Sequence, residues 1–216
     1  MTSLKTLPMF PLGSVLLPGS VLPLHVFEPR YRALVRDCLE GDREFGVVLI
    51  ARGNEVGGGD LRNDVGVCAR ILQVAALDDG RFAVICLGAE RIRVVRWLPD
   101  DPYPRAEVSE WPDTDDLAYQ GLLPLAARVR SLAALARELG DPAGDPTQDL
   151  PEQLIECSYA LADLAPLGPV DRLRLLCCAG PQDRLNLLTS LSEDLEPLLR
   201  FRLGDGPSTS NPPEAW

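Results

Sequence analysis

Apolar residues in the first half of the chain come in short alternating runs, a pattern that predicts β-strands. Strands are predicted over residues 4–10, 20–27, 45–51, 65–77, 82–87, 91–97 and 103–111. A glycine-rich loop over 52–63 and an Asp78-Asp79-Gly80 turn separate some of them. Gly88–Glu90 predicts a short break between two strands. Pro102 and Pro104 place the start of the last strand at a sheet edge, because proline cannot donate to a strand ladder.

One helix is predicted between the second and third strands. Pro29 suits a first helical turn, where its missing N–H costs nothing, and Gly41 ends the segment. Apolar residues recur between them at helical spacing: Tyr31, Leu34, Val35, Cys38 and Leu39. This single helix would pack on the predicted sheet.

The pattern changes after Trp111-Pro112-Asp113 to leucine and alanine with a period near that of a helix. A helix capped by Thr114, Asp115 or Asp116 is predicted to reach Leu139-Gly140, kinked or split by Pro124. Residues 141–150 form a Pro/Gly/Asp linker. Three further helices are predicted over Pro151–Leu164, Val170–Ala179 and Gln182–Leu203.

These patterns predict an α+β fold: an amino-terminal curled β-sheet or partial barrel with one helix, followed by a carboxy-terminal helical bundle. The predicted units are residues 1–112, residues 113–203 and a disordered tail over 204–216.

The net charge of the chain and its distribution argue against a nucleic-acid partner. The net charge is −11, of which −2 lies in residues 1–110 and −9 in residues 111–216, so we expect no nucleic-acid partner. No apolar run is long enough to span a bilayer, and four prolines in the first 24 residues interrupt any signal peptide. The six cysteines form no CxxC pair and are expected to be reduced. We therefore expect a cytoplasmic protein without membrane contact.

The sequence contains few of the residues and motifs that catalytic sites require. Lys5 is the sole lysine and lies outside any glycine-rich phosphate loop, which excludes a P-loop and argues against a Ser-Lys dyad. His25 is the sole histidine, and no GxSxG elbow accompanies it. We expect no catalytic residue, no metal site and no cofactor.

An ordered series of short motifs runs through the β-rich half: Phe10-Pro11-Leu12, Leu22–Tyr31, Phe45-Gly46, Gly66, Asp79-Gly80, Gly88–Arg91 and Pro102-Tyr103. The series resembles the amino-terminal, substrate-binding domain of Lon proteases. The resemblance covers residues 5–203 and is looser in the helices, where Asp183-Arg184-Leu185 is the best match. The chain ends where a full-length Lon would begin its ATPase module, so we expect a stand-alone domain without ATPase or protease domains.

The resemblance implies a β-rich subdomain, a helical subdomain and a role in recognising or presenting polypeptides. We expect a non-catalytic module that binds unfolded or extended polypeptides, or a partner protein. Two alternatives remain: an adaptor or assembly protein for one partner, with the acidic helical half docking on a basic surface, and an ATP-independent peptidase that uses His25. The oligomeric state is not predicted.

Seven residues are candidates for the binding surface: Phe10, Phe27, Glu28, Arg30, Tyr31, Arg91 and Tyr103. Each also has a structural interpretation. Glu28 and Arg30 would fix the strand-to-helix corner with Tyr31 packed beneath it, and Arg91 would pair with an acid within the barrel. The aromatic residues Trp97, Tyr103 and Trp111 would seal the junction of the two subdomains or anchor a peptide.

Overall fold

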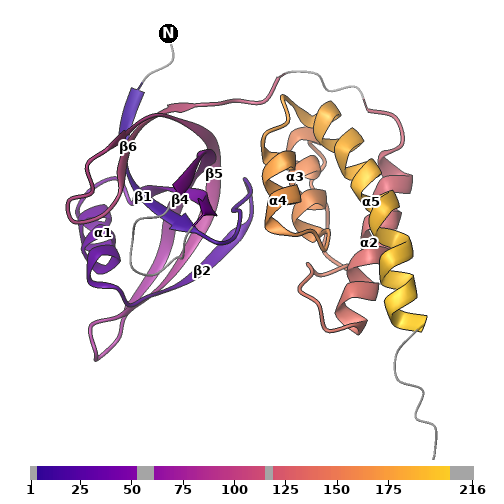
Figure 1. Cartoon of the computed structure of the whole chain (residues 1–216), viewed down its shortest axis with the longest axis horizontal. Helices are drawn as coiled ribbons and strands as arrows, with labels where there is room; N and C mark the ends of the chain where they lie inside the picture. Colours follow the sequence, from indigo (N-terminus) through magenta and orange to yellow (C-terminus); the bar gives the residue numbers. More distant parts are fainter. Residues whose placement is uncertain (1–3, 53–60, 115–118, 205–216) are drawn as a thin grey trace, which may run out of the picture.

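A strongly curled six-stranded sheet forms the amino-terminal half of the protein (Figure 1). The computed structural model describes residues 4–52, 61–114 and 119–204. The strands are β1 (Leu4–Leu12), β2 (Val21–Val26), β3 (Glu44–Arg52), β4 (Leu61–Ala76), β5 (Phe82–Leu98) and β6 (Arg105–Glu110). Their order is β2-β5-β4-β3-β1-β6, and an additional β5–β6 pairing closes all but β2 into a barrel. Only β1 and β3 are parallel among these pairs.

Strand β5 is continuous, so the predicted break at Gly88–Glu90 is wrong. Gly88 lies opposite Ala69 and Arg91 lies opposite Val67, which leaves Ala89 and Glu90 facing a single residue of β4. The glycine and polar residues that suggested a break instead form a β-bulge, which bends the strand and changes the direction of the side chains after it.

The sheet edge also differs from the prediction. Strand β6 pairs with β1 on one side and with β5 on the other, so Pro102 and Pro104 precede an interior strand. The prolines are tolerated because β6 itself begins after them, at Arg105. The edge strand is β2, whose one partner is β5 and which carries Pro23.

Helix α1 (Pro29–Glu40) has the predicted bounds, with Pro29 in its first turn and Gly41 at its carboxyl cap. Four of the five predicted apolar residues form its buried face: Tyr31, Leu34, Val35 and Cys38. The fifth, Leu39, is exposed. The hydrophobic spacing therefore correctly located the side that packs on the barrel.

The four helices of the carboxy-terminal half are α2 (Leu122–Glu138), α3 (Leu154–Leu164), α4 (Pro169–Leu176) and α5 (Pro181–Gly204). Helix α2 does not begin at Thr114, whose backbone N–H donates to the Ala179 carbonyl at 3.0 Å; the alternative caps, Asp115 and Asp116, lie outside the described residues. Pro124 lies in the first turn of α2, where no intrahelical N–H is required, so it neither kinks nor splits the helix. The predicted tail, apart from Gly204 at the end of α5, also lies outside the described residues.

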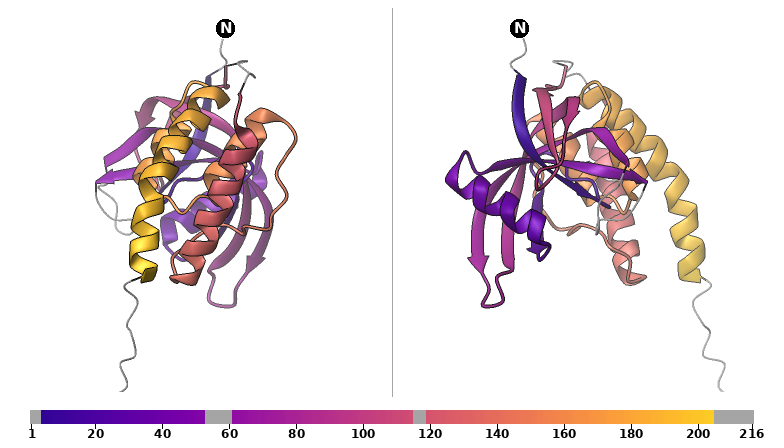
Figure 2. Two further views of the ribbon diagram at one scale, coloured as in Figure 1. Left: turned by 90° about the vertical axis from the view of Figure 1, so that its right-hand side faces the viewer. Right: turned by 60° about the vertical axis from the view of Figure 1, so that its left-hand side comes forward.

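Helices α3 and α4 lie beside the barrel, whereas α2 and α5 lie side by side on the outer flank (Figures 1 and 2). One continuous buried cluster includes residues of both halves, among them Leu17 before β2 and Leu176 at the end of α4. The mixed α+β class is thus confirmed, and the apolar core joins the barrel to the helices. None of the described helices has the length and hydrophobicity needed to cross a membrane.

Candidate functional site

A buried ionic network joins the barrel, the connecting segment and the helices. Oδ1 of Asp113 lies 2.9 Å from Arg91 Nη2 and 2.5 Å from Arg184 Nη2. Arg91 comes from β5 directly after the bulge, and Arg184 comes from the first turns of α5. All three side chains are less than a tenth exposed. A single carboxylate therefore bridges two buried cations from opposite sides of the junction.

Arg91 also terminates helix α4. Its Nη1 donates to the carbonyl oxygens of Leu176 at 2.8 Å and Cys178 at 2.6 Å, and Nη2 donates to Ala179 at 3.5 Å. The Leu176 carbonyl is one of the acceptors that a helix leaves unsatisfied at its carboxyl end, and Cys178 and Ala179 lie directly beyond the helix. Helix α4 ends at Leu176, three residues before the predicted Ala179, and Arg91 binds the backbone over this stretch. Burial lowers the pKa of Arg91 from its usual range.

On the helical side, Arg184 is held by α3. Its Nη1 donates to Ser158 Oγ at 2.7 Å and its Nη2 to the Tyr159 hydroxyl at 2.7 Å, while the Tyr159 hydroxyl donates to Asp113 Oδ2 at 2.9 Å. Burial raises the pKa of Tyr159, which keeps the phenol protonated as a donor. The donors of the network have partners apart from Arg91 Nε, which is buried and makes no hydrogen bond to a described residue. These bonds orient the helices against the barrel.

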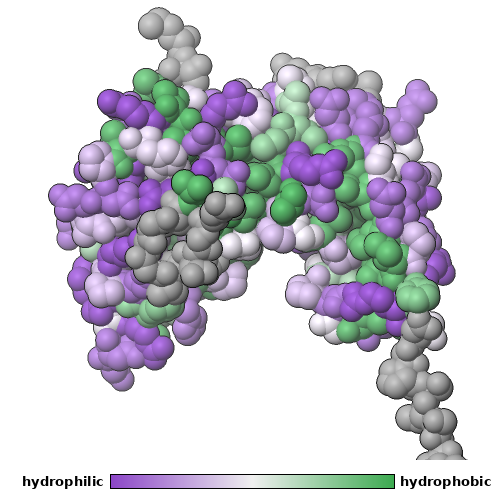
Figure 3. Space-filling model, in the orientation of Figure 1, coloured by the Kyte–Doolittle hydropathy of each residue, from purple (hydrophilic) through white to green (hydrophobic). Residues whose placement is uncertain are grey.

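A cleft of about 490 Å³ lies beside this network, between the barrel and α3. The segment before β2, the β5 bulge, the end of β6 and the segment before α3 form its walls together with α3. Apolar surface comes from Trp111, Ile155 and Ala160, among others. In the space-filling view, apolar side chains gather where the two halves meet (Figure 3). The volume is in the range of protein ligand sites.

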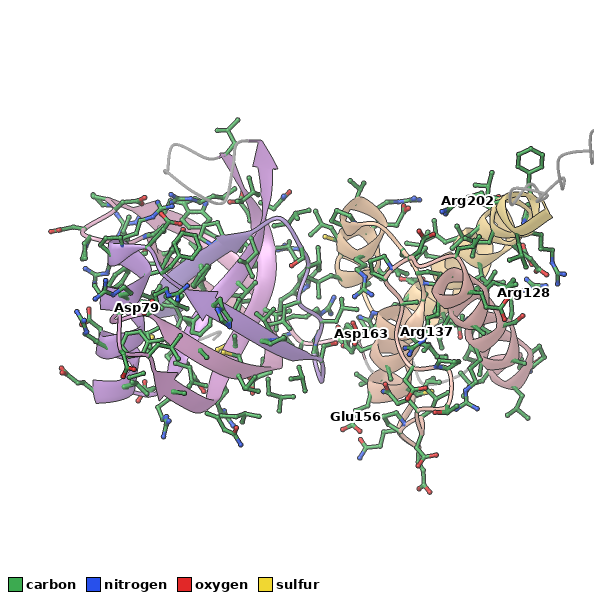
Figure 4. The ribbon with its side chains drawn as sticks, turned by 90° about the horizontal axis from the view of Figure 1, so that it is seen from below. Asp79, Arg128, Arg137, Glu156, Asp163 and Arg202 are labelled. Atoms are coloured by element: carbon green, nitrogen blue, oxygen red, sulfur yellow. The ribbon has the colours of Figure 1, made fainter. Side chains whose placement is uncertain are left out.

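Carboxylates dominate the ionisable groups of the cleft. Six acids line it against a single arginine, Arg91. Asp113 is neutralised by the buried network, and Asp163 pairs with Arg172 at 2.7 Å. The other four form no ion pair with a described residue: Glu90, Glu110, Asp149 and Glu156. Seen from below, Glu156 and Asp163 lie on the side of the bundle that faces the barrel, whereas Arg128 and Arg202 lie on the far side (Figure 4).

A second, smaller hollow of about 180 Å³ lies between β1, β2 and the start of α1. Four of the seven residues predicted for the binding surface line it: Phe10, Phe27, Glu28 and Tyr31. Phe10 stacks on Tyr31 with ring centroids 4.0 Å apart, and the Arg30 guanidinium lies 4.4 Å from the Tyr31 centroid. Arg30 Nε also donates to Glu28 Oε2 at 3.1 Å. These contacts fix the strand-to-helix corner, and Phe27 alone of the four is more than half exposed.

The remaining two predicted residues lie elsewhere. Tyr103 packs against α1 and donates to Asp37 Oδ2 at 2.5 Å; burial and this hydrogen bond raise the pKa of Tyr103 to about 12. Arg91 lines the cleft, but its acid partner is Asp113, beyond the barrel strands, and not an acid within the barrel as predicted. The seven residues therefore do not form one site.

The three aromatic residues predicted to seal the junction also separate. Trp111 lies there, with the guanidinium groups of Arg91 and Arg93 4.5 Å and 4.0 Å from its ring centroid. Trp97 packs on the barrel interior and donates to Asp64, and Tyr103 faces α1. The prediction that these aromatic residues lie at the junction of the two subdomains is thus correct for Trp111 and wrong for Trp97 and Tyr103.

Sequence reasoning missed Asp113, Tyr159 and Arg184 as members of a network. Asp113 was noted only as part of Trp111-Pro112-Asp113, where the pattern changes from strands to helices. Arg184 was noted only within Asp183-Arg184-Leu185, the segment of the helices that best resembles the Lon domain. That match was the available signal, because a charged residue at the start of a leucine-rich helix can be buried and paired.

Other chemistry is limited within the described residues. His25 lies on the edge strand β2 and makes no hydrogen bond to a serine or carboxylate of the described chain. No group of three or more His, Cys, Asp or Glu side chains in the described ranges could hold a metal ion. All six cysteines, which the described residues include, are free thiols.

Comparisons with known proteins agree with this architecture. The family model for the ATP-dependent protease La (LON) substrate-binding domain matches residues 6–193. The crystal structure of a Lon N-terminal domain protein from Xanthomonas campestris superposes with a TM-score of 0.66 at 34% identity, covering 86% of this chain and 98% of that one. The N-terminal domain of the Mycobacterium avium complex Lon protease gives 0.58 at 22% identity, covering 88% and 99%, which supports the fold.

Two curated relatives are much longer. Lon protease 2 of Herpetosiphon aurantiacus is 32% identical over 89% of this chain and 24% of its own length. The LON peptidase N-terminal domain and RING finger protein C14F5.10c of Schizosaccharomyces pombe is 25% identical over 92% of this chain and 47% of its own length. The chain therefore spans less than half the length of these relatives, and it belongs to the LON substrate-binding domain family.

Proposed function

We propose that this chain is a non-catalytic module that binds extended or unfolded polypeptide segments in the cleft between the barrel and α3. The observation that carries the proposal is the cleft itself, about 490 Å³ in volume, with both apolar and polar walls, in a domain of a substrate-binding family. We place this activity in the reducing cytoplasm, because all six cysteines are unpaired.

The buried network supports the proposal through preorganisation. Arg91, Asp113 and Arg184 hold the two walls of the cleft at a fixed separation, so a peptide that enters would find a formed site. Binding to a formed site avoids part of the cost of ordering the protein.

The proposal is tested by filling the cleft. Ala160 lines it from α3 and is partly buried, so Ala160→Trp would occupy space that a peptide needs. Ala127 is exposed on α2 and lies outside the cleft lining, so Ala127→Trp is the matched control. Binding is measured on an array of short peptides that tile unfolded proteins, with circular dichroism to confirm that both variants are folded.

We expect the wild type and Ala127→Trp to bind the same subset of peptides, and Ala160→Trp to bind them at least about ten-fold more weakly. The proposal is wrong if the wild type binds no peptide, or if a folded Ala160→Trp protein binds as the wild type does. Cleavage of bound peptides by the wild type would contradict the non-catalytic assignment.

A further inference from the structure

Four carboxylates face the cleft without an ion-pair partner among the described residues: Glu90, Glu110, Asp149 and Glu156. They come from both walls. Glu90 lies in the β5 bulge and Glu110 ends β6 on the barrel side, whereas Asp149 precedes α3 and Glu156 lies in its first turn. A cation between the walls would therefore meet negative charge from two sides.

The arginines close to these acids have other partners. Arg70, whose charge acts on Glu90, is paired with Glu44, and Arg130 donates to the Gln148 carbonyl beside Asp149. The guanidinium of Arg91 is bound to Asp113 and to the carbonyls at the end of α4, and that of Arg93 lies against the Trp111 ring. Asp113 is in turn neutralised by Arg91 and Arg184. Neither Arg91 nor Arg93 therefore forms an ion pair with any of the four acids.

The apolar part of the lining suits the rest of a basic side chain. Ile155 and Ala160 of α3 lie in the same cleft as the four carboxylates. Lysine and arginine carry long aliphatic stems that pack on apolar surface while the charged end reaches a carboxylate. A metal ion fits the arrangement less well, because the described residues contain no cluster of carboxylates close enough to coordinate one.

We propose that the cleft selects polypeptide segments that carry lysine or arginine. This inference rests on the proposed function and names the substrate class of the same site. Charge complementarity carries it: four acids without an ion-pair partner among the described residues line the cleft, two from each wall, and the helical wall belongs to a half of the chain whose net charge is −9. Segments rich in acidic residues would be repelled from the same walls.

The test compares two short serine- and alanine-rich peptides that differ in one property. The first has Lys-Leu-Lys at its centre, and the second has acetyl-lysine in place of both lysines, which keeps the stems and removes the charge. Both carry an uncharged dye, and binding is followed by fluorescence anisotropy. We expect the lysine peptide to bind about ten-fold more tightly at about 50 mM salt, and the difference to shrink at about 300 mM salt.

A double variant assigns the effect to the cleft. Glu110→Gln with Glu156→Gln removes one carboxylate from each wall and should reduce the lysine preference to about three-fold or less. Glu40→Gln with Glu138→Gln removes the same charge from exposed positions outside the cleft and should keep the full preference.

Equal affinity for the two peptides, or a preference that the cleft variant retains, overturns the inference. If both peptides bind equally and Ala160→Trp abolishes binding, the substrate class is wrong and the proposed function stands. If neither these peptides nor the peptide array bind the wild type, the proposed function fails as well.

Discussion

Removing the Asp113 charge should destabilise the protein far more than removing the charge of an exposed aspartate. Asp113→Asn keeps the size of the side chain and an oxygen that accepts hydrogen bonds, but it leaves Arg91 and Arg184 without a counter-charge. Arg91 is 3% exposed and Arg184 is 0% exposed, so neither guanidinium can recover its hydration.

The magnitude follows from the geometry. Removing one partner of a buried ion pair costs about 3–5 kcal/mol, because an uncompensated buried charge remains. Here one oxygen lies 2.9 Å from one guanidinium nitrogen and 2.5 Å from the other, so the substitution also exposes each cation to the other. The asparagine oxygen retains part of the hydrogen bonding, which places the expected loss near the lower limit, at about 3 kcal/mol.

Guanidinium-induced unfolding, monitored by circular dichroism, measures the loss. Asp141→Asn is the control, because Asp141 pairs with the exposed Arg202 at 2.5 Å and an exposed pair contributes little. We expect a clearly lower midpoint for Asp113→Asn and a nearly unchanged one for Asp141→Asn. Equal midpoints for the two variants would refute the claim that the network holds the barrel to the helices.

Other predictions concern the buried thiols and one hydrogen bond. Burial raises the pKa of three thiols, those of Cys38, Cys68 and Cys86, from 9.0 to about 12. The unfolded chain therefore loses these protons first, and the free energy of unfolding should fall as the pH rises from 9 to 12. A pH series of unfolding midpoints that stays flat over this range would contradict this prediction. In a thiol-reagent assay, the exposed Cys177 and the partly exposed Cys178 should react first and the four buried cysteines only on unfolding; rapid reaction of all six would be inconsistent with the core. Tyr103→Phe should lower the free energy of unfolding by about 1 kcal/mol through loss of the bond to Asp37, and an unchanged value would show that this bond contributes nothing.

Much of the fold could be predicted because its elements follow local periodicity. Helix α1 has the predicted bounds, since Pro29, Gly41 and the spacing between them are all local signals. The predictions based on proline were wrong where the effect of the residue depends on its position in a helix or on the strands that pair beside it. Pro124 lies in a helical first turn, and Pro102 and Pro104 precede a strand that is paired on both sides.

The candidate site was harder to predict, because its parts are distant in sequence. Arg91 is separated from Leu176 by 85 positions, and Asp113 from Arg184 by 71 positions. Which acid meets which arginine depends on the bulge in β5 and on how α4 and α5 pack, and neither follows from local pattern. The contacts at the strand-to-helix corner could be predicted from the sequence, because Glu28, Arg30 and Tyr31 are close neighbours in the chain.

Peptide binding in the cleft is tested most directly by a backbone nuclear magnetic resonance titration of the protein with the Lys-Leu-Lys peptide. We expect chemical-shift changes centred on Glu90, Trp111, Ile155 and Ala160, which line the cleft. Changes centred on Phe27 and the other residues of the hollow between β1 and β2, with the cleft unaffected, would contradict it.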